Sequence, residues 1–301
     1  MEKVIRFILI GFVFGALGVL IANEIPRKDS IELMLREWEM EVNKDFPHET
    51  PFGRINGVSF KDKFVVYDIT IYEKFYPTSN IIEFYKEHYE DFKYMLLYGF
   101  SALNGIDNNV NKLVYLLFKV DYDIRVVVNI KDDKSISWDI KKEEFDEFLK
   151  QCKLTPTEAL RKVLDIQIEL VKLNIPVNVN SEIQNRNITT EFMASTIEEG
   201  YLLIDIKTID NLIVFEYLVD DTNLDFDFAT LRALSQTDEG KMIFAEIFAE
   251  DASFREFLNL FVVSQSNLGI MYKGITSMDA VEIVLPYTIL RKYCTIPQDI
   301  L

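Results

Sequence analysis

The sequence is poor in the side chains on which most metal and disulfide chemistry depends. Its 301 residues include only two cysteines and two histidines. Two cysteines exclude a disulfide-dense scaffold. Cys152 and Cys294 can form one bridge outside the cytosol, and two buried free thiols are the equal alternative. Their spacing and the shortage of histidine exclude a zinc cluster.

Basic residues are also scarce relative to acidic ones. With 32 Lys and Arg against 49 Asp and Glu, the formal net charge is −17. A nucleic-acid partner is therefore excluded, because its phosphates would be repelled. Broad adhesion to anionic lipid surfaces is excluded for the same reason. Cationic partners and metal ions stay open, although an acidic solvated surface explains the same charge.

Complete active-site motifs are missing as well. His48 lies in a loop bounded by prolines, and His88 lies beside Glu87, Glu90 and Asp91 on a predicted helix. A metalloprotease helix needs a second histidine four residues away, which His88 does not have. A solvated charged helix face is the better interpretation of this group.

Three other segments lack the key residues of the motifs they suggest. Gly99–Gly105 has no Gly-x-Ser-x-Gly elbow and is interpreted as a helix end. Asp220–Asp227 lacks the central glycine and distal glutamate of a calcium loop, so we interpret it as a strand-to-helix connection with N-capping acids. Gly240-Lys241 lacks the upstream glycine of a phosphate loop. We therefore predict no catalytic, cofactor-binding or metal-binding residues.

What the sequence does contain is an apolar N-terminal segment. Lys3 and Arg6 precede the uncharged run Phe7–Asn23. As a helix, this run extends roughly 25 Å and can span a membrane when Arg6 reaches the interface. The basic residues before it predict a cytoplasmic N-terminus and an exported remainder. Residues 1–24 are expected to be a retained signal anchor, with a signal peptide cleaved after Ala22 as the alternative.

The remaining chain is predicted to form two related α+β domains, 29–152 and 156–301. Each half shows a helix, two strands, a helical region, a short helix, a strand hairpin and a closing helix. The elements of the first half are 29–45, 55–60, 64–71, 79–97, a helix from Asp107, 124–130, 135–140 and 142–151. Those of the second half are 157–174, 201–208, 212–219, 228–248, a helix from Asp251, 268–274, 280–285 and 286–293, with a further strand at 188–193. Each domain would be a mostly antiparallel four-stranded sheet with helices on one side.

A matched strand and a constant spacing support this internal repeat. Phe64–Ile71 and Leu212–Val219 both contain four bulky residues, an acid and three more residues, a pattern typical of a buried strand. From Val110 onward, apolar positions recur at an offset of 144 residues. Chance agreement of periodic patterns is the alternative. Thr155 and Pro156 supply the capping oxygen and the donor-free first residue of helix 157–174.

The second half also resembles a known group of sequences. The residues that carry the resemblance are Pro176–Asn178, Val179, Ile213–Leu218, Asp251–Leu258, Gly269–Tyr272 and Val281–Ile283. On them, Pro176–Leu285 is similar to uncharacterised exported bacterial α+β domains. The resemblance implies an exported domain and carries no known activity. It also implies a cysteine near the start of the short helix, where this chain has Ala249 and Ala252.

These features favour a membrane-anchored, extracytoplasmic binding or assembly module of an envelope complex, without catalysis. It would be a single-pass protein of the cytoplasmic membrane, with the membrane bound through Phe7–Asn23 and an envelope protein as partner. The alternatives are an exported hydrolase with an acidic cleft between the domains and a cleaved, soluble periplasmic ligand-binding protein. An assembly protein should expose an apolar or aromatic patch, with Phe75, Tyr76 and Tyr94–Phe100 as candidates. An enzyme should instead contain a deep pocket with titratable groups.

Overall fold

The computed structural model describes residues 35–36, 39–40, 43–49, 53–71, 78–106, 121–130, 134–173, 201–221, 227–250 and 252–294. The chain divides into two compact units, and the division falls inside helix α8 (Pro156–Lys172), between Ile166 and Gln167. Each unit contains a mixed sheet with helices, so the α+β class is confirmed. The domain limits 29–152 and 156–301 stay predictions.

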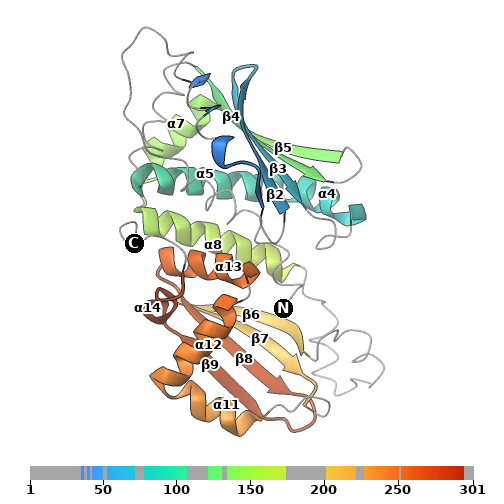
Figure 1. The fold of residues 1–301 in the computed structure, drawn as a ribbon, viewed down its shortest axis with the longest axis vertical. Coiled ribbons are helices and arrows are strands. Elements are labelled where there is room, and N and C mark those ends of the chain that lie inside the picture. The colour runs from blue at the N-terminus through green and yellow to red at the C-terminus, as the bar shows by residue number, and fades with distance from the viewer. Residues whose placement is uncertain are drawn as a thin grey trace. The chain divides into compact units, whose positions relative to one another are not determined.

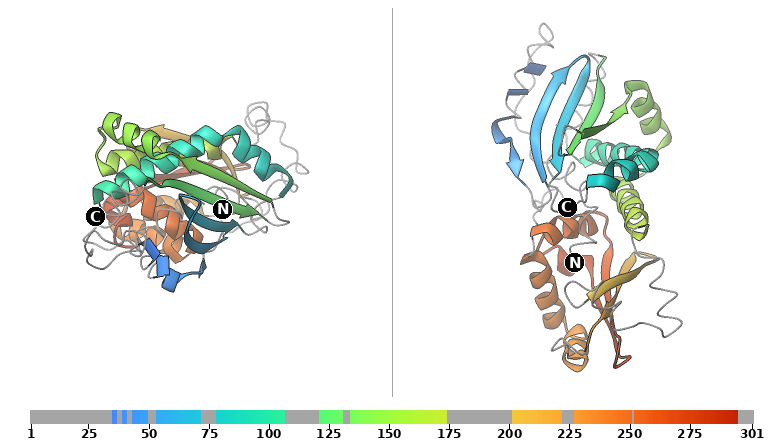
Figure 2. Two further views of the ribbon diagram at one scale, coloured as in Figure 1. Left: turned by 90° about the horizontal axis from the view of Figure 1, so that it is seen from above. Right: turned by 90° about the vertical axis from the view of Figure 1, so that its right-hand side faces the viewer.

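The first unit is built on the sheet β1-β2-β3-β4-β5, in which sequential strands are neighbours. Its strands are β1 (His48–Glu49), β2 (Gly53–Lys61), β3 (Phe64–Ile71), β4 (Asp123–Ile130) and β5 (Lys134–Ile140). Helices α4 (Thr78–Glu87), α5 (Tyr89–Ile106) and α7 (Lys142–Gln151) lie on one face of this sheet (Figures 1 and 2). Val65, Tyr67 and Ile69 of β3 are buried, and the Tyr67 ring lies 6.0 Å from that of Phe100 on α5. The alternate residues of β3 therefore face the helices.

The second unit is built on the sheet β6-β7-β8-β9. Its strands are β6 (Tyr201–Ile209), β7 (Leu212–Val219), β8 (Asn267–Gly274) and β9 (Ala280–Leu285). Its other helices are α11 (Phe228–Ser235), α12 (Asp238–Glu250), α13 (Ala252–Val263) and α14 (Tyr287–Leu290). Helices α11 to α13 cover one face of the sheet (Figure 2), where the rings of Phe215 on β7 and Phe261 on α13 lie 6.4 Å apart.

Most strand pairs are antiparallel, as predicted, but both sheets are mixed because the central pair of each is parallel. The outer pairs β2–β3, β4–β5, β6–β7 and β8–β9 are antiparallel, whereas β3–β4 and β7–β8 are parallel. The reason is the helical segment between the two central strands. It returns the chain to the end at which the previous strand began, as a parallel pair requires.

Local geometry recurs between the units at fixed spacing. Strand β3 begins at Phe64, and β7 begins 148 residues later at Leu212. The starts of β2 and β6 are also 148 residues apart. A register shift between Ile55 and Gly57 recurs between Leu203 and Asp205.

The turns before the strands recur in the same way. Asp62 and Asp210 have φ angles of 52° and 53° in the hairpin turns, again 148 residues apart. Before β4 and β8, Asp121 and Gln265 have φ angles of 63° and 51°, at the predicted offset of 144 residues. Both pairs adopt the left-handed conformation that ordinary side chains rarely take.

Among the described helices, three predicted boundaries differ from the structure, and the first is the closing helix 286–293, of which α14 covers only Tyr287–Leu290. The predicted helix 79–97 is two helices, α4 and α5, which meet at His88, and α5 continues to Ile106. Gly99–Gly105 therefore lies within α5, where it forms the last turns of the helix. The predicted helix 228–248 is interrupted at Gln236 and Thr237, shortly before Gly240, and so forms α11 and α12.

The proposed aromatic patch is also corrected. Within Tyr94–Phe100, only Tyr94 is exposed, whereas Met95, Leu96, Leu97 and Phe100 belong to the core. Because α5 covers the sheet, the apolar side of this segment turns inward, and its aromatic surface is limited to Tyr94 and the half-buried Tyr98.

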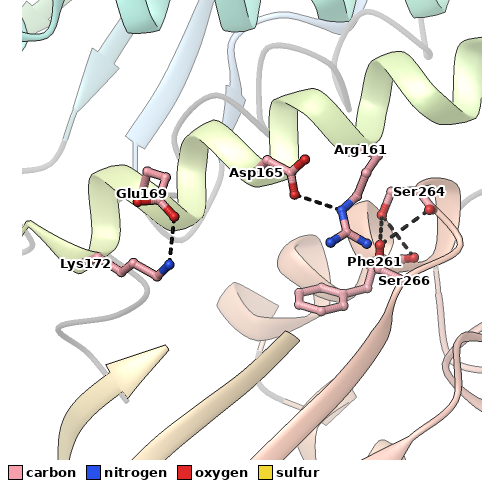
Figure 3. A network of polar contacts seen from close by, with 7 residues as sticks. All are labelled: Arg161, Asp165, Glu169, Lys172, Phe261, Ser264 and Ser266. Atoms are coloured by element: carbon pink, nitrogen blue, oxygen red, sulfur yellow. Dashed lines mark hydrogen bonds and ion pairs between the residues drawn. The ribbon is translucent and has the colours of Figure 1, made fainter. Parts of the chain in front are cut away.

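Helix α8 begins with the predicted cap. The Thr155 backbone N–H donates to Glu158 Oε2 over 2.8 Å, and the Glu158 N–H donates to Thr155 Oγ1 over 3.3 Å. This reciprocal pair satisfies two backbone donors at the helix start. Ion pairs Arg161–Asp165 and Lys172–Glu169 follow along α8 (Figure 3).

Several predicted features lie outside the described residues. They are the anchor 1–24 with Phe7–Asn23, the helix from Asp107, the strand 188–193, and Phe75 with Tyr76. Among the described helices, none combines the length and apolar character needed to cross a membrane.

Candidate functional site

The candidate site is the face of each sheet opposite the helices, which we call the acid face. Side chains alternate between the two faces of a strand. Since Tyr67 and Phe215 face helices, the acids next to them, Asp68 on β3 and Glu216 on β7, point to the other face. These are the acids at the centre of the two matched strand sequences, and they are equivalent at the 148-residue offset.

In the first unit, Asp68 is bound by neutral amides from the two neighbouring strands. Asn56 Nδ2 on β2 donates to Asp68 Oδ1 over 2.6 Å, and Asn129 Nδ2 on β4 donates to the same oxygen over 2.5 Å. Asn56 also contacts Thr70 Oγ1 at 2.8 Å and accepts from Arg54 Nε at 2.9 Å. Among the described residues, no lysine or arginine forms an ion pair with Asp68. The carboxylate thus lies on a half-exposed, amide-rich surface.

A second polar group lies further along the same face. Arg125 on β4 binds Asp139 on β5 through two parallel hydrogen bonds of 2.6 and 2.7 Å. Its guanidinium carbon lies 3.9 Å from the centre of the Phe64 ring. The hydrogen bond from Arg125 holds the pKa of Asp139 below its ordinary value, against the opposing effect of burial. Both side chains are partly exposed and therefore accessible.

In the second unit, the strand acid is bound by two ammonium groups. Lys207 Nζ on β6 donates to Glu216 Oε1 over 2.5 Å, and Lys273 Nζ on β8 donates to Oε2 over 2.6 Å. The Glu216 side chain is 7% exposed, while those of Lys207 and Lys273 are 49% and 38% exposed. Burial by itself raises the pKa of Glu216, but the two lysine hydrogen bonds outweigh it and lower that pKa. Glu216 is therefore an anion at neutral pH.

The two acid faces place different chemistry at equivalent positions. Asn129 corresponds to Lys273 at the 144-residue offset. The charged cross-strand pair Arg125–Asp139 corresponds to the apolar pair Gly269–Val284. One scaffold therefore presents an amide-rich face with an ion pair in the first unit and a lysine-clamped acid in the second.

The two ion-paired acids of these faces have lowered pKa values. A general acid or base works best with a pKa near the operating pH, whereas Glu216 and Asp139 have lowered pKa values and carry ion pairs. Burial raises the pKa of Tyr67 and Tyr85 far above its ordinary value, so these two phenols stay protonated.

The histidine candidate is a local surface contact. His88 lies where α4 meets α5; its Nδ1 is 3.1 Å from Asp91 Oδ2, and its ring centre is 4.7 Å from that of Phe84. Glu87 and Glu90 are exposed beside it. Within the described ranges, no three His, Cys, Asp or Glu side chains are arranged to hold a metal. His48 lies in β1, and Cys152 and Cys294 are free thiols.

Of the predicted capping acids, Asp227 has the expected role at a helix start, whereas Asp221 binds a turn between strands. Asp227 accepts from the Ala229 N–H over 2.9 Å and from the Thr230 hydroxyl at the start of α11. Asp221 accepts from the backbone N–H groups of Thr276 and Ser277, each over 2.9 Å, and so fixes the turn between β8 and β9. At the end of α13, Ser264 and Ser266 are likewise satisfied by each other, with their hydroxyls 2.9 Å apart (Figure 3).

Sequence patterns indicated the two strand acids but not their partners. A single acid between bulky residues at the same position of two strands was the available signal. Lys207, Lys273, Asn56 and Asn129 lie on other strands, so they approach the acids only through strand pairing. Comparison with protein-family models, curated proteins and solved structures finds no match to this chain.

Proposed function

We propose that this chain is a membrane-anchored, extracytoplasmic binding or assembly module of an envelope complex, and that it catalyses no reaction. Its two units are duplicated domains, and their acid faces contact different partner groups. The observation that carries this proposal is the contrast between a repeated scaffold and two acid faces with different side chains.

The repeated scaffold is detailed enough to support a duplication. The backbone N–H of Asp123 donates to the Lys63 carbonyl over 2.9 Å, and that of Asn267 donates to the Asn211 carbonyl over 2.7 Å. The side chains of the same two residues accept from the N–H groups that begin α7 and α14. Shared turns, register shifts and caps support a common origin, because hydrophobic periodicity alone does not require them.

The acid faces differ in side-chain chemistry between the two units. When duplicated domains acquire different contacts, we expect the turns of the scaffold to be kept and the charged side chains of the contact surface to change. Buried carboxylates cost free energy unless they are paired, and Glu216 keeps such a pair with Lys207 and Lys273. The half-exposed lysine ammonium groups leave donors for an anionic partner group, whereas Asp68 offers an acceptor.

The membrane anchor rests on the sequence. Phe7–Asn23 supplies an apolar run of spanning length after Lys3 and Arg6. It places both acid faces outside the cytoplasm. In this arrangement, a tether raises the effective concentration of the domains at the membrane, which favours low-affinity contacts within an envelope complex.

Site-specific photo-crosslinking in intact bacteria tests the binding role. A photoreactive residue replaces Ser137 or Glu282, both exposed on the acid faces next to Val127 and Met271 in the pairing. Matched controls carry it at Glu143 on α7 or Ala233 on α11, which are exposed on helices. The proposal expects discrete adducts from the acid-face positions alone. Equal labelling at all four positions, or none, would overturn it.

Membrane fractionation tests the anchor. The full chain should remain in the membrane pellet after alkaline extraction, with Met1 or Glu2 as its N-terminus. A soluble chain beginning near Asn23 would identify the cleaved, soluble alternative instead.

A further inference from the structure

We propose that the exposed side of α12 is a docking surface for a basic amphipathic helix of a partner protein. This surface lies on the helical layer of the second unit (Figures 1 and 2). It goes beyond the proposed function, because it does not involve the acid faces or the membrane anchor.

The apolar part of the surface consists of two isoleucines. Ile243 is 46% exposed and Ile247 is 53% exposed, and they lie one helical turn apart. The opposite side of α12 is already used, since Phe244, Ala245 and Phe248 are buried. A helix that packs its inner side and also exposes two branched apolar side chains at i and i+4 presents a ready contact stripe.

Acidic residues lie along one edge of this pair of isoleucines. Glu239, Glu246 and Glu250 are exposed. With about 100° of rotation per residue, all three lie within about 60° of Ile243 around the helix axis. On α12 itself, the charged side chains beside the apolar stripe are therefore of one sign. Lys241, which lies away from it, is 3.9 Å from Asp238 of the same helix.

This charge distribution selects the occupant. A second copy would bring the same glutamates face to face, and like charges at short range oppose association. Anionic lipid is repelled for the same reason, as it is by the chain's net charge of −17. A helix with leucine-type side chains on one stripe and Lys or Arg beside them buries the isoleucines and pairs with the acids. The stripe from Glu239 to Glu250 extends about 16 Å, which corresponds to roughly three turns of a partner helix.

The test uses the full chain in neutral detergent and a fluorescent peptide of about 18 residues. The peptide has leucines along one helical stripe and lysines on either side of them. We expect Ile243→Ser with Ile247→Ser to weaken binding by at least about tenfold. Because both side chains are exposed, this variant should retain its fold, which circular dichroism verifies. The matched control, Ile209→Ser with Met278→Ser, removes side chains that are 57% and 73% exposed elsewhere in this unit and should change the dissociation constant less than twofold.

A charge control separates docking from general attraction to an acidic protein. Glu239→Gln, Glu246→Gln and Glu250→Gln together should weaken binding about fivefold or more, with a reduced salt dependence. Glu83→Gln, Glu87→Gln and Glu90→Gln remove the same charge from exposed positions of the first unit and should have little effect. Equal losses in the two triple variants would overturn the proposal, as would unchanged binding in the isoleucine variant.

The other occupants give different results. Concentration-dependent dimerisation that disappears with Ile243→Ser and Ile247→Ser would assign the surface to a second copy and overturn the proposal. Binding to phosphatidylglycerol vesicles that the same variant abolishes would assign it to lipid and overturn it as well.

Discussion

Lys273 on β8 reaches diagonally across the sheet to Glu216 on β7, with its Nζ 2.6 Å from Oε2. In the first unit, Asn129 and Asp68 have the same diagonal relationship, at 2.5 Å. The acid of the central strand is thus recognised from the next strand in both units, by an ammonium group in one and an amide in the other.

The lysine clamp predicts that Glu216 contributes to the stability of the second unit. Glu216→Gln keeps the side-chain volume and removes the charge that both ammonium groups bind. We expect the free energy of opening of β7 to fall by about 1–2 kcal/mol, because hydrogen bonds to charged groups are strong. The loss is limited to this range because the lysines, which are partly exposed, can bind water instead. Native-state hydrogen exchange of the β7 amides measures this unit separately from the other.

Asp205→Asn is the matched control for this substitution. The Asp205 carboxylate is 39% exposed and lies 4.0 Å from Lys207 Nζ. We expect a change of about 0.5 kcal/mol or less, as for other exposed ion pairs. A loss as large as that of Glu216→Gln would show that the burial of Glu216 is not what makes its pairing important.

The same carboxylate predicts a pH dependence. The pKa of Glu216 is lowered in the folded chain by the lysine hydrogen bonds, which outweigh burial, so the unfolded state binds protons more readily. The stabilisation is complete above the unfolded glutamate pKa of about 4.3 and is lost as the pH falls through the lower folded value. Hydrogen exchange of β7 between about pH 6 and pH 3 should show a shallower pH dependence in Glu216→Gln than in the wild type. Identical dependence in the two proteins would contradict the clamp.

Strand positions were predictable because their signals are local. Phe64–Ile71 and Leu212–Val219 are strands with the predicted bounds, since bulky, β-branched runs specify a buried strand within a few residues. The parallel pairing of β3 with β4 was not predictable in this way. Pairing direction depends on where the intervening helices return the chain, and side-chain alternation is the same for both directions.

The candidate site was predictable only in part for a related reason. The acid at position 68 or 216 is visible in the strand pattern, but no spacing relates Glu216 to Lys273, which is 57 residues away. Similarly, the pattern of residues 79–97 is continuous across His88, so it did not indicate where α4 ends and α5 begins.

Asp123 and Asn267 cap equivalent helices in the two units. We therefore expect each unit to tolerate the residue that the other has at this position. Asp123 Oδ1 accepts from the Lys142 N–H over 2.9 Å, and Asn267 Oδ1 accepts from the Tyr287 N–H over 3.0 Å. Alanine at either position should cost about 1 kcal/mol, the usual cost of a lost helix cap. Asp123→Asn and Asn267→Asp should each stay within about 0.5 kcal/mol of the wild type, because both side chains provide the accepting oxygen.

Hydrogen exchange at the first turns of α7 and α14 measures these effects. The expected result is faster exchange in the alanine variants and wild-type rates in the Asp–Asn exchanges. If Asp123→Asn were as destabilising as Asp123→Ala, the ion pair of Asp123 with Lys141, at 2.7 Å, would be the important contact and the caps would not be equivalent.

We expect Gly240→Ala to be destabilising, although alanine is normally more favourable than glycine within a helix. Its N–H donates to Thr237 Oγ1 over 3.0 Å at the start of α12, and a Cβ atom would collide with the Leu234 carbonyl oxygen of α11. Helix propensity alone would make Gly240→Ala stabilising by up to about 1 kcal/mol. Because the obstacle is backbone, we expect instead a loss of about 1–3 kcal/mol, as for other overpacked sites. Chemical denaturation, together with hydrogen exchange in α12, shows whether Gly240→Ala raises or lowers the free energy of unfolding. Glu239→Ala, at an exposed position of the same turn, serves as the control with a change below about 0.5 kcal/mol. A stabilised Gly240→Ala variant would show that α11 and α12 can separate without cost.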